Sequence, residues 1–149
     1  MEFITDSALE TINLGEKISH VLRPGDVVLL TGDLSGGKTT ITKGIGKGLG
    51  VKRIINSPTF NIVKTYEGNN VTLNHFDLYR LNGLNNDFDL EEYFTPDSIC
   101  VIEWPYNIKE LLPEEYLLIN LEDIGNDKRK ITINTVGKRY EGRNMSCIL

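Results

Sequence analysis

The sequence has few cysteines, no long apolar run and no excess of basic residues. Its 149 residues include only Cys100 and Cys147, which are too few and too far apart for a disulfide framework or a zinc site. No apolar run approaches the length that crosses a bilayer, and no N-terminal segment has the charged, apolar and cleavable parts of a signal peptide. These absences predict a cytoplasmic protein that does not bind a membrane.

Charge is distributed unevenly along the chain. The net charge is -5, yet residues 128–149 hold six Lys/Arg against one acid, which leaves the first 127 residues at -10. Such a split suggests an acidic or nucleic-acid partner near the C-terminus. Lysines on the open edge of a solvated strand pair are the more frequent explanation. We therefore expect no DNA binding, and we expect the basic tail at 138–149 to fray.

The first third of the chain has a strand between two helical segments. Residues 6–22 carry a helical apolar stripe, and Ser7 precedes Glu10 at capping-box spacing. The run VVLLTG at 27–32 has the composition of a short buried parallel strand. A helix is expected over 38–51, although each of its interior glycines weakens it by roughly 1 kcal/mol relative to alanine. Its order should depend on packing and on a bound anion.

The remaining sequence is dominated by strand patterns. Residues 55–81 alternate β-rich runs with turn residues, with a hairpin connection at 67–70, and a short helix is expected at 89–94. Further strands are expected at 98–104, 115–123 and 129–137. The order of elements predicts an α/β fold made of one domain over residues 1–149. Its sheet should be mixed, with parallel core strands flanked by helices and antiparallel strands.

The segment after the first buried strand fits the phosphate-binding pattern G-x-x-x-x-G-K-[ST]. Glycines let backbone N–H groups surround an anion, and the helix that follows directs its positive end at the same place. Lys38 would contact the β- and γ-phosphates, and the Thr39 hydroxyl would bind Mg²⁺. A glycine-rich turn with a surface lysine is the structural alternative. The expected nucleotide-binding residues here are Gly32, Asp33, Leu34, Ser35, Gly36, Gly37, Lys38, Thr39 and Thr40.

Two acidic residues follow apolar runs and could hold the metal. Glu103 ends ICVIE, and Asp77 lies in HFDLYR. An acid past a strand is often only a turn or cap residue, and the sequence does not decide which of the two contacts Mg²⁺. His75 could position a water, although a core or surface histidine is the commoner case. Arg80 could pair with a phosphate or an acid.

Two further features concern the nucleotide. Thr59, in SPTF, could sense the γ-phosphate as part of a switch loop, or Ser57 and Pro58 could simply set a turn. The chain has no Asn-Lys-x-Asp segment, which guanine-specific phosphate-loop proteins usually carry. ATP is therefore expected rather than GTP.

The order of four motifs resembles a known family. TGDLSGGKTT, NSPTFNIVKTY, HFDLYRL and VIEWP occur in the order and spacing of the bacterial TsaE family, also called YjeE. The match runs from about Ser7 to Leu121, and HFDLYRL with IEWP is far more specific than the phosphate loop alone. One departure is Ser35-Gly36-Gly37, where the family usually has Gly-Ala-Gly.

The resemblance implies a small Mg²⁺-dependent ATPase, slow alone, that binds TsaB and TsaD. Together these proteins install threonylcarbamoyl on the tRNA adenosine next to the anticodon, and tRNA is expected to be contacted only through the complex. Carried onto this sequence, Lys38 and Thr39 hold phosphate and Mg²⁺, Asp77 matches the family's functional aspartate, Glu103 matches its strand-terminal acid, and Thr59 lies in a switch-like segment. The expected catalytic residues are Lys38, Asp77 and Glu103, and the candidate metal ligands are Thr39, Glu103 and Asp77, with the choice between the two acids left open. Other readings are a phosphate-loop small-molecule kinase and a nucleotide-gated adaptor with little hydrolysis.

Overall fold

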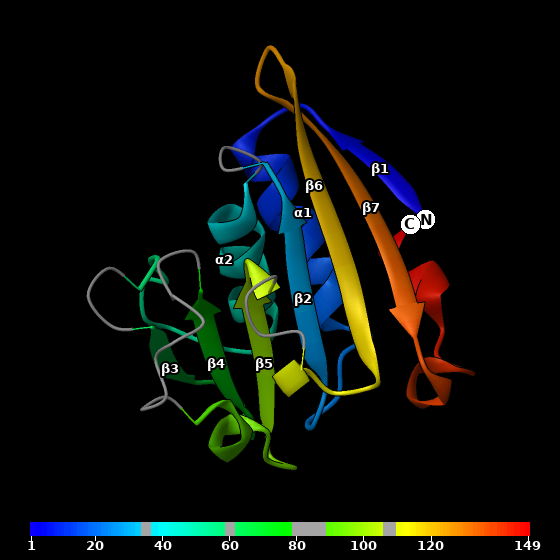
Figure 1. The fold of residues 1–149 in the computed structure, drawn as a ribbon. Helices are drawn as coiled ribbons and strands as arrows, with labels where there is room; N and C mark the ends of the chain where they lie inside the picture. The colour runs from blue at the N-terminus through cyan, green and yellow to red at the C-terminus, as the bar shows by residue number, and fades with distance from the viewer. Residues whose placement is uncertain (34–36, 59–61, 79–88, 106–109) are drawn as a thin grey trace.

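The chain forms one seven-stranded sheet in the part of it that the structure describes. A computed structural model describes residues 1–33, 37–58, 62–78, 89–105 and 110–149. The strand order across the sheet is β1-β7-β6-β2-β5-β4-β3 (Figure 1). The strands are β1 (Glu2–Thr5), β2 (Val27–Gly32), β3 (Val63–Glu67), β4 (Thr72–Asp77), β5 (Ser98–Glu103), β6 (Tyr116–Gly125) and β7 (Lys128–Val136).

The centre of the sheet is parallel and its edges are antiparallel. β2 pairs in parallel with β5 and β6, and β4 pairs in parallel with β5. β1, β3 and β7 pair antiparallel with their neighbours. The predicted mixed sheet with a parallel core is confirmed. Sequence patterns missed β1, because four residues at the edge of a sheet are too short to show a clear alternation.

Both α-helices pack on one face of the sheet. They are α1 (Ala8–Ser19) and α2 (Lys38–Gly48), and they lie side by side behind β2 in Figure 1. Ile18 and Ile45, one from each helix, share a buried cluster with Leu30 of β2. The predicted start of α1 is confirmed, since the Ser7 hydroxyl accepts a hydrogen bond of 3.1 Å from the backbone N–H of Glu10.

Glycines allow the two helices to approach closely. A Cβ atom on Gly44 would lie 2.0 Å from the carbonyl oxygen of Ile12, and one on Gly15 would lie 2.4 Å from that of Ile41. Any larger residue would force the backbones apart. The glycines of α2, which lower its intrinsic stability, thus permit the packing that stabilises it.

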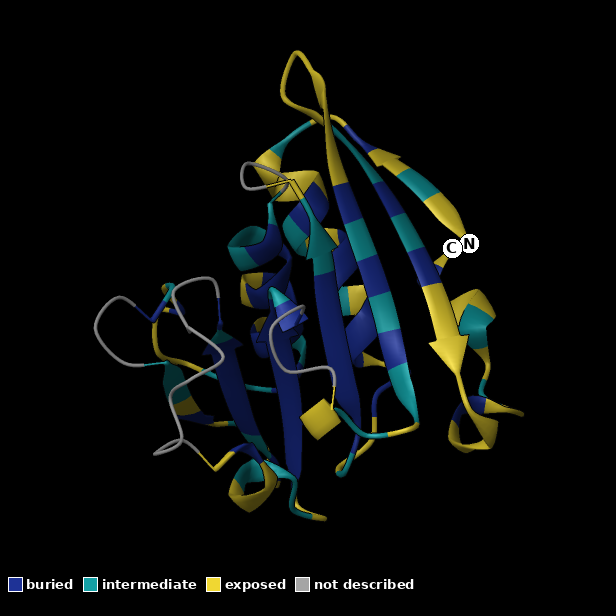
Figure 2. Cartoon of the chain, in the orientation of Figure 1, coloured by how far each residue is buried: buried dark blue, intermediate teal, exposed yellow. Residues whose placement is uncertain are grey.

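The opposite face carries a smaller apolar cluster. Phe76 of β4 and Ile102 of β5 are buried in it, and Tyr93 meets Phe76 edge to face with ring centroids 5.2 Å apart. Tyr93 ends the 3₁₀ helix η1 (Leu90–Tyr93), where a short helix was predicted. Figure 2 shows β2 and β5 buried along most of their length, and all six residues of β5 are buried.

The C-terminal segment is packed, in contrast to the predicted fraying. It contains the 3₁₀ helices η3 (Lys138–Tyr140) and η4 (Met145–Ile148), in which Tyr140 and Ile148 are buried. Arg139 Nε lies 2.7 Å from Asp26 Oδ1, and Arg143 pairs with the other carboxylate oxygen. Because Asp26 is more than a hundred residues away, no local periodicity could have revealed these contacts.

Asp26 is fully buried just before β2 begins. Burial alone would raise its pKa, but hydrogen bonds from Arg143, Arg139 and the backbone of Arg23 outweigh that effect and hold the pKa below its usual 3.8. The ionised form is therefore stabilised by folding. This contribution is complete above 3.8 and is lost as the pH falls through the lower folded-state pKa.

We predict that Asp26→Asn lowers the free energy of unfolding by roughly 3–5 kcal/mol near neutral pH, because it leaves two arginines at a buried site without their carboxylate. Urea denaturation measures this loss. The difference in free energy of unfolding between variant and wild type should narrow as the pH falls below 3.8. As a control, Lys130→Met removes an exposed pair with Glu2 and should cost less than about 1 kcal/mol. Equal losses in the two variants would contradict the assignment.

Candidate nucleotide-binding site

The first and last glycines of the phosphate-loop motif adopt backbone conformations that favour glycine. Gly32, the last residue of β2, has φ +118°, and a Cβ atom there would lie 1.9 Å from the Leu121 carbonyl oxygen. Gly37 has φ +94° and is the N-cap residue of α2. The expected strand and helix are thus present on either side of the motif. Leu34, Ser35 and Gly36 lie outside the described residues.

Lys38 is the first residue of α2 and is buried at the base of this loop, with 4% of its surface exposed. Its ammonium group donates to the Gly32 carbonyl at 3.3 Å and to the Asp33 carbonyl. Burial lowers the pKa of Lys38, and the charges of Glu103, Asp33 and Asp77 partly oppose that shift. The motif lysine therefore lies within the field of three carboxylates.

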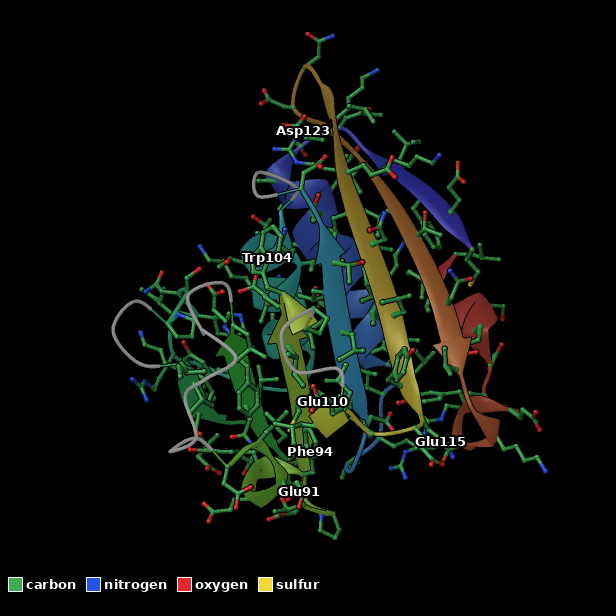
Figure 3. The ribbon with its side chains drawn as sticks, in the orientation of Figure 1. Glu91, Phe94, Trp104, Glu110, Glu115 and Asp123 are labelled. Carbon is green, nitrogen blue, oxygen red and sulfur yellow. The ribbon has the colours of Figure 1, made fainter. Side chains whose placement is uncertain are left out.

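Trp104 places an aromatic face against the same lysine. Its ring centroid is 4.2 Å from Lys38 Nζ, within the range of a cation–π contact. Trp104 follows β5 directly and has φ +60°, a conformation that a tryptophan rarely adopts. Figure 3 shows it at the end of β5, beside the start of α2. Backbone strain of this kind is concentrated at functional sites.

Glu103 ends β5 with its carboxylate 3% exposed. One oxygen, Oε1, accepts from the Thr39 hydroxyl at 3.4 Å, and the other, Oε2, lies 2.9 Å from His75 Nε2. Thr39 Oγ1 is also 2.7 Å from Ser57 Oγ. The hydroxyl expected to bind Mg²⁺ and one of the two expected acids are therefore in contact.

The second acid lies at the same edge of the sheet. Asp77 ends β4 and is the register partner of Glu103 across the parallel pair. The negative charges of Asp77 and Glu103 both favour the charged form of Lys38 and so oppose the lowering of its pKa by burial. The structure thus brings Lys38, Thr39, Asp77 and Glu103 together. Thr59 and Arg80 lie outside the described residues, so their predicted roles stay predictions.

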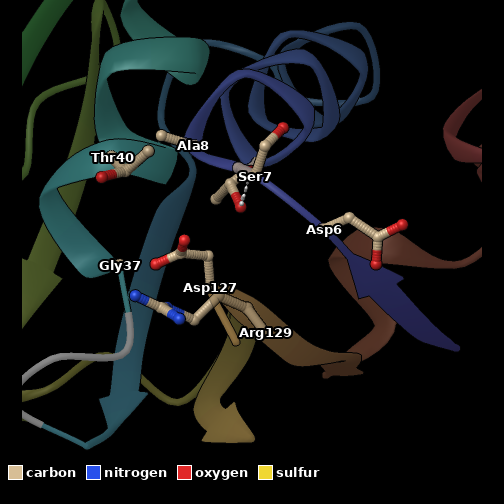
Figure 4. A pocket seen from close by; sticks show the side chains of 8 residues that line it. Asp6, Ser7, Ala8, Gly37, Thr40, Asp127 and Arg129 are labelled. Atoms are coloured by element: carbon tan, nitrogen blue, oxygen red, sulfur yellow. Dashed lines mark hydrogen bonds between the residues drawn. The ribbon is translucent and has the colours of Figure 1, made fainter. Parts of the chain in front are cut away.

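A cavity of about 290 Å³ opens beside the start of α2 (Figure 4). Gly37 and Thr40 form one wall, the beginning of α1 forms another, and the β6–β7 hairpin closes it. Its lining residues are Asp6, Ser7, Ala8, Thr11, Gly37, Thr40, Asp127 and Arg129. Sequence reasoning found only Gly37 and Thr40, because the other residues carry no local signal and meet the loop only through the sheet order.

The β6–β7 hairpin is tied to the phosphate loop by a hydrogen bond. The Asp33 carboxylate accepts from the backbone N–H of Asp123 at 3.1 Å, and Asp123 in turn pairs with Arg129 at 3.3 Å. Figure 3 places Asp123 near the hairpin, at the end of the sheet where β2 ends. Asp33 therefore links the expected phosphate site to the cavity wall that contains Arg129.

The donor set at the loop suits a hard cation that is bound partly by phosphate. It consists of a threonine hydroxyl and carboxylates, which are oxygen ligands of the kind Mg²⁺ prefers. Within the described residues, no group of three or more His, Cys, Asp and Glu side chains could hold a metal alone. Mg²⁺ usually takes one or two carboxylates and completes its shell with water and substrate phosphates. The residues present fit that mode.

The sequence matches the family model of "Threonylcarbamoyl adenosine biosynthesis protein TsaE" over residues 5–131. The chain belongs to the TsaE family. A relative from Bacillus subtilis with the name tRNA threonylcarbamoyladenosine biosynthesis protein TsaE is 46% identical over 132 residues, which cover 89% of this chain and 84% of the relative. A relative of the same name from Treponema pallidum is 38% identical over 135 residues, covering 89% and 99%.

A solved structure agrees with this assignment. The crystal structure of Bacillus subtilis YdiB superposes with a TM-score of 0.82 at 40% sequence identity, covering 95% of this chain and 88% of that chain. The predicted family and the phosphate-loop fold class are therefore confirmed. None of the helices in the described part of the chain has the length and apolar character needed to cross a membrane.

Proposed function

We propose that this TsaE-family chain is a Mg²⁺-dependent ATPase that acts with TsaB and TsaD in threonylcarbamoylation of the tRNA adenosine next to the anticodon. One observation carries the ATPase proposal. The Thr39 hydroxyl, at the start of α2, lies 3.4 Å from the buried Glu103 carboxylate, at the end of β5, with the cation of Lys38 nearby. This meeting of segments 64 residues apart in the chain supports a role in phosphoryl chemistry.

In this proposal the phosphates with Mg²⁺ and the nucleoside occupy two neighbouring parts of the site. Lys38 and the start of α2 would hold the phosphates, because a helix N-terminus and a lysine both favour negative charge. Thr39 with Glu103 and Asp77 would hold Mg²⁺. Thr40 and Gly37 belong both to the loop and to the cavity, so the nucleoside would extend toward Arg129. ATP is preferred in this proposal on the sequence argument given above.

The two acids would act mainly during hydrolysis. Bound Mg²⁺ neutralises charge that develops on phosphate oxygens. Glu103 is held at Oε2 by His75 and contacts Thr39 more loosely through Oε1, so it could hold the metal or its water in one orientation. Asp77, less buried at the end of the adjacent strand, can orient a water against the phosphates.

The partner and location proposals rest on the family. The relatives' names place them in tRNA threonylcarbamoyladenosine biosynthesis. The first 127 residues have a net charge of -10, which makes this part of the chain a poor binder of RNA on its own. We therefore propose that tRNA is reached through the TsaB–TsaD complex in the cytoplasm, and that the chain binds neither DNA nor a membrane.

One contact favours a second candidate, a nucleotide-gated adaptor. The Ser57 hydroxyl lies 2.7 Å from Thr39 Oγ1. Binding of Mg²⁺ at Thr39 would therefore alter a contact of the segment that leads to Thr59. Binding of ATP could then order a docking surface without rapid hydrolysis. In this alternative, nucleotide controls the capture of TsaB and TsaD, and turnover is incidental.

The deciding experiment measures ATP hydrolysis by the purified chain, alone and with TsaB plus TsaD, and uses GTP as the competing nucleotide. The ATPase proposal expects a slow, ATP-selective activity that rises with the partners. Activity that ignores the partners would refute the proposed role in the complex. Nucleotide-dependent capture of TsaB–TsaD without a rise in hydrolysis would favour the adaptor.

We predict that Lys38→Ala abolishes ATP binding measured by calorimetry, because it removes the cation that would face the phosphates. Lys43→Ala is the matched control, since Lys43 is an exposed lysine on the same helix. The Lys43→Ala variant should bind ATP with the affinity of the wild type. Unchanged affinity in Lys38→Ala would refute the phosphate site.

We also predict that Asp77→Ala and Glu103→Ala each lower kcat at least tenfold while ATP affinity changes less. The reason is that metal and water placement act mainly on the transition state. Steady-state kinetics with calorimetry separates the two effects. Glu92→Ala, at an exposed acid in η1, serves as the control. A wild-type kcat in both variants would contradict the assigned roles.

A further inference from the structure

His75 lies in the middle of β4, behind the two acids of the site. It is the register partner of Val101, and Asp77 and Glu103 form the next register pair on the same face. This face packs against α2, because Leu73 and Val101 share a buried cluster with Ile41 and Ile45. The imidazole is fully buried. It is therefore placed between the apolar core and the carboxylate of Glu103.

The two oxygens of Glu103 have different partners. Oε2 lies 2.9 Å from His75 Nε2, at the distance of a charge-assisted hydrogen bond, whereas Oε1 faces Thr39 at the looser distance of 3.4 Å. The histidine holds the inner oxygen and leaves the outer one directed at the expected metal-binding hydroxyl. Rotation of the carboxylate would break the shorter contact.

His75 makes no other side-chain hydrogen bond within the described residues. Its Nδ1 atom is buried and has no partner there. A buried polar atom without a partner is unfavourable. If His75 only filled the core, an apolar side chain would therefore serve better. The polar function of His75 is thus concentrated in the single contact to Glu103.

We infer that His75 is a positioning residue that orients the Glu103 carboxylate for Mg²⁺ at the nucleotide site. This inference rests on the proposed Mg²⁺·ATP site and assigns a role to a residue outside it. His75 does not contact the nucleotide and is not a metal ligand, because its Nε2 is occupied by Glu103 and its ring is buried. Groups behind a ligand typically tune metal affinity by about 10- to 100-fold.

Two amide substitutions test the inference without an apolar replacement. The side-chain amide nitrogen introduced by His75→Gln can reach the position of Nε2, whereas the one introduced by His75→Asn reaches only the position of Nδ1. The first readout is the ratio of ATP affinities with and without Mg²⁺, measured by calorimetry. The second is kcat for ATP, measured with TsaB and TsaD present.

We expect His75→Asn to lose part of the Mg²⁺-dependent gain in ATP affinity, no more than Glu103→Ala loses, and to lower kcat by about tenfold or more. Its affinity for ATP without Mg²⁺ should stay within about threefold of the wild type, since Lys38 and the loop are intact. His75→Gln should recover most of both losses. Leu73→Val, two residues earlier on the same face, controls for simple core destabilisation and should lower Tm without changing the Mg²⁺ effect.

Three results would overturn the inference. The first is a wild-type Mg²⁺ effect on ATP affinity in His75→Asn, and the second is an equal loss in the Asn and Gln variants. The third is a Leu73→Val variant whose Mg²⁺ effect falls in proportion to its decrease in Tm. A wild-type chain that binds ATP no more tightly with Mg²⁺ than without it would overturn the proposed Mg²⁺ site together with this inference. The wild-type measurement therefore separates the two failures.

Discussion

The arrangement of the site depends on one constraint, the parallel alignment of β2, β5 and β4. Their carboxyl ends meet at one edge of the sheet, where Gly32, Glu103 and Asp77 are the last residues of the three strands. Ligands of open α/β sheets bind at this edge. α2 starts at the same edge, so its first residues, Lys38 and Thr39, are delivered to the two acids. The meeting of these residues is therefore a consequence of strand direction.

Close packing of the helices fixes where that start of α2 lies. Gly15 and Gly44 let the two helix backbones touch, so the position of α2 on the sheet is set together with that of α1. The 3.4 Å contact of Thr39 with Glu103 requires such fixed placement. Glycines in a helix are usually explained as weak points. Here they lower intrinsic helix stability and in return define the position of the end of α2 that carries Lys38 and Thr39.

Much of this arrangement could be predicted from the sequence, because its signals are local. The phosphate-loop pattern, the apolar run of β5 and the capping box at Ser7 each lie within a few residues. Other features depend on residues that are distant in the chain. The contact of His75 with Glu103 spans 28 residues, and it appears only once β4 and β5 are known to be adjacent and in register. The contribution of Arg129 to the cavity likewise requires the position of the β6–β7 hairpin.

Two buried acids, one near each end of the parallel core, show how stability and function are divided. Asp26, before β2, has two arginines and a backbone N–H as partners. Glu103, at the opposite edge, has a histidine and a loosely held hydroxyl. A fully paired carboxylate stabilises the fold but cannot accept a metal, whereas an incompletely paired one costs stability and keeps coordination sites. The C-terminal arginines thus strengthen the end of the sheet opposite the proposed site, and the strained Trp104 and Glu103 lie where the proposed ligand would bind.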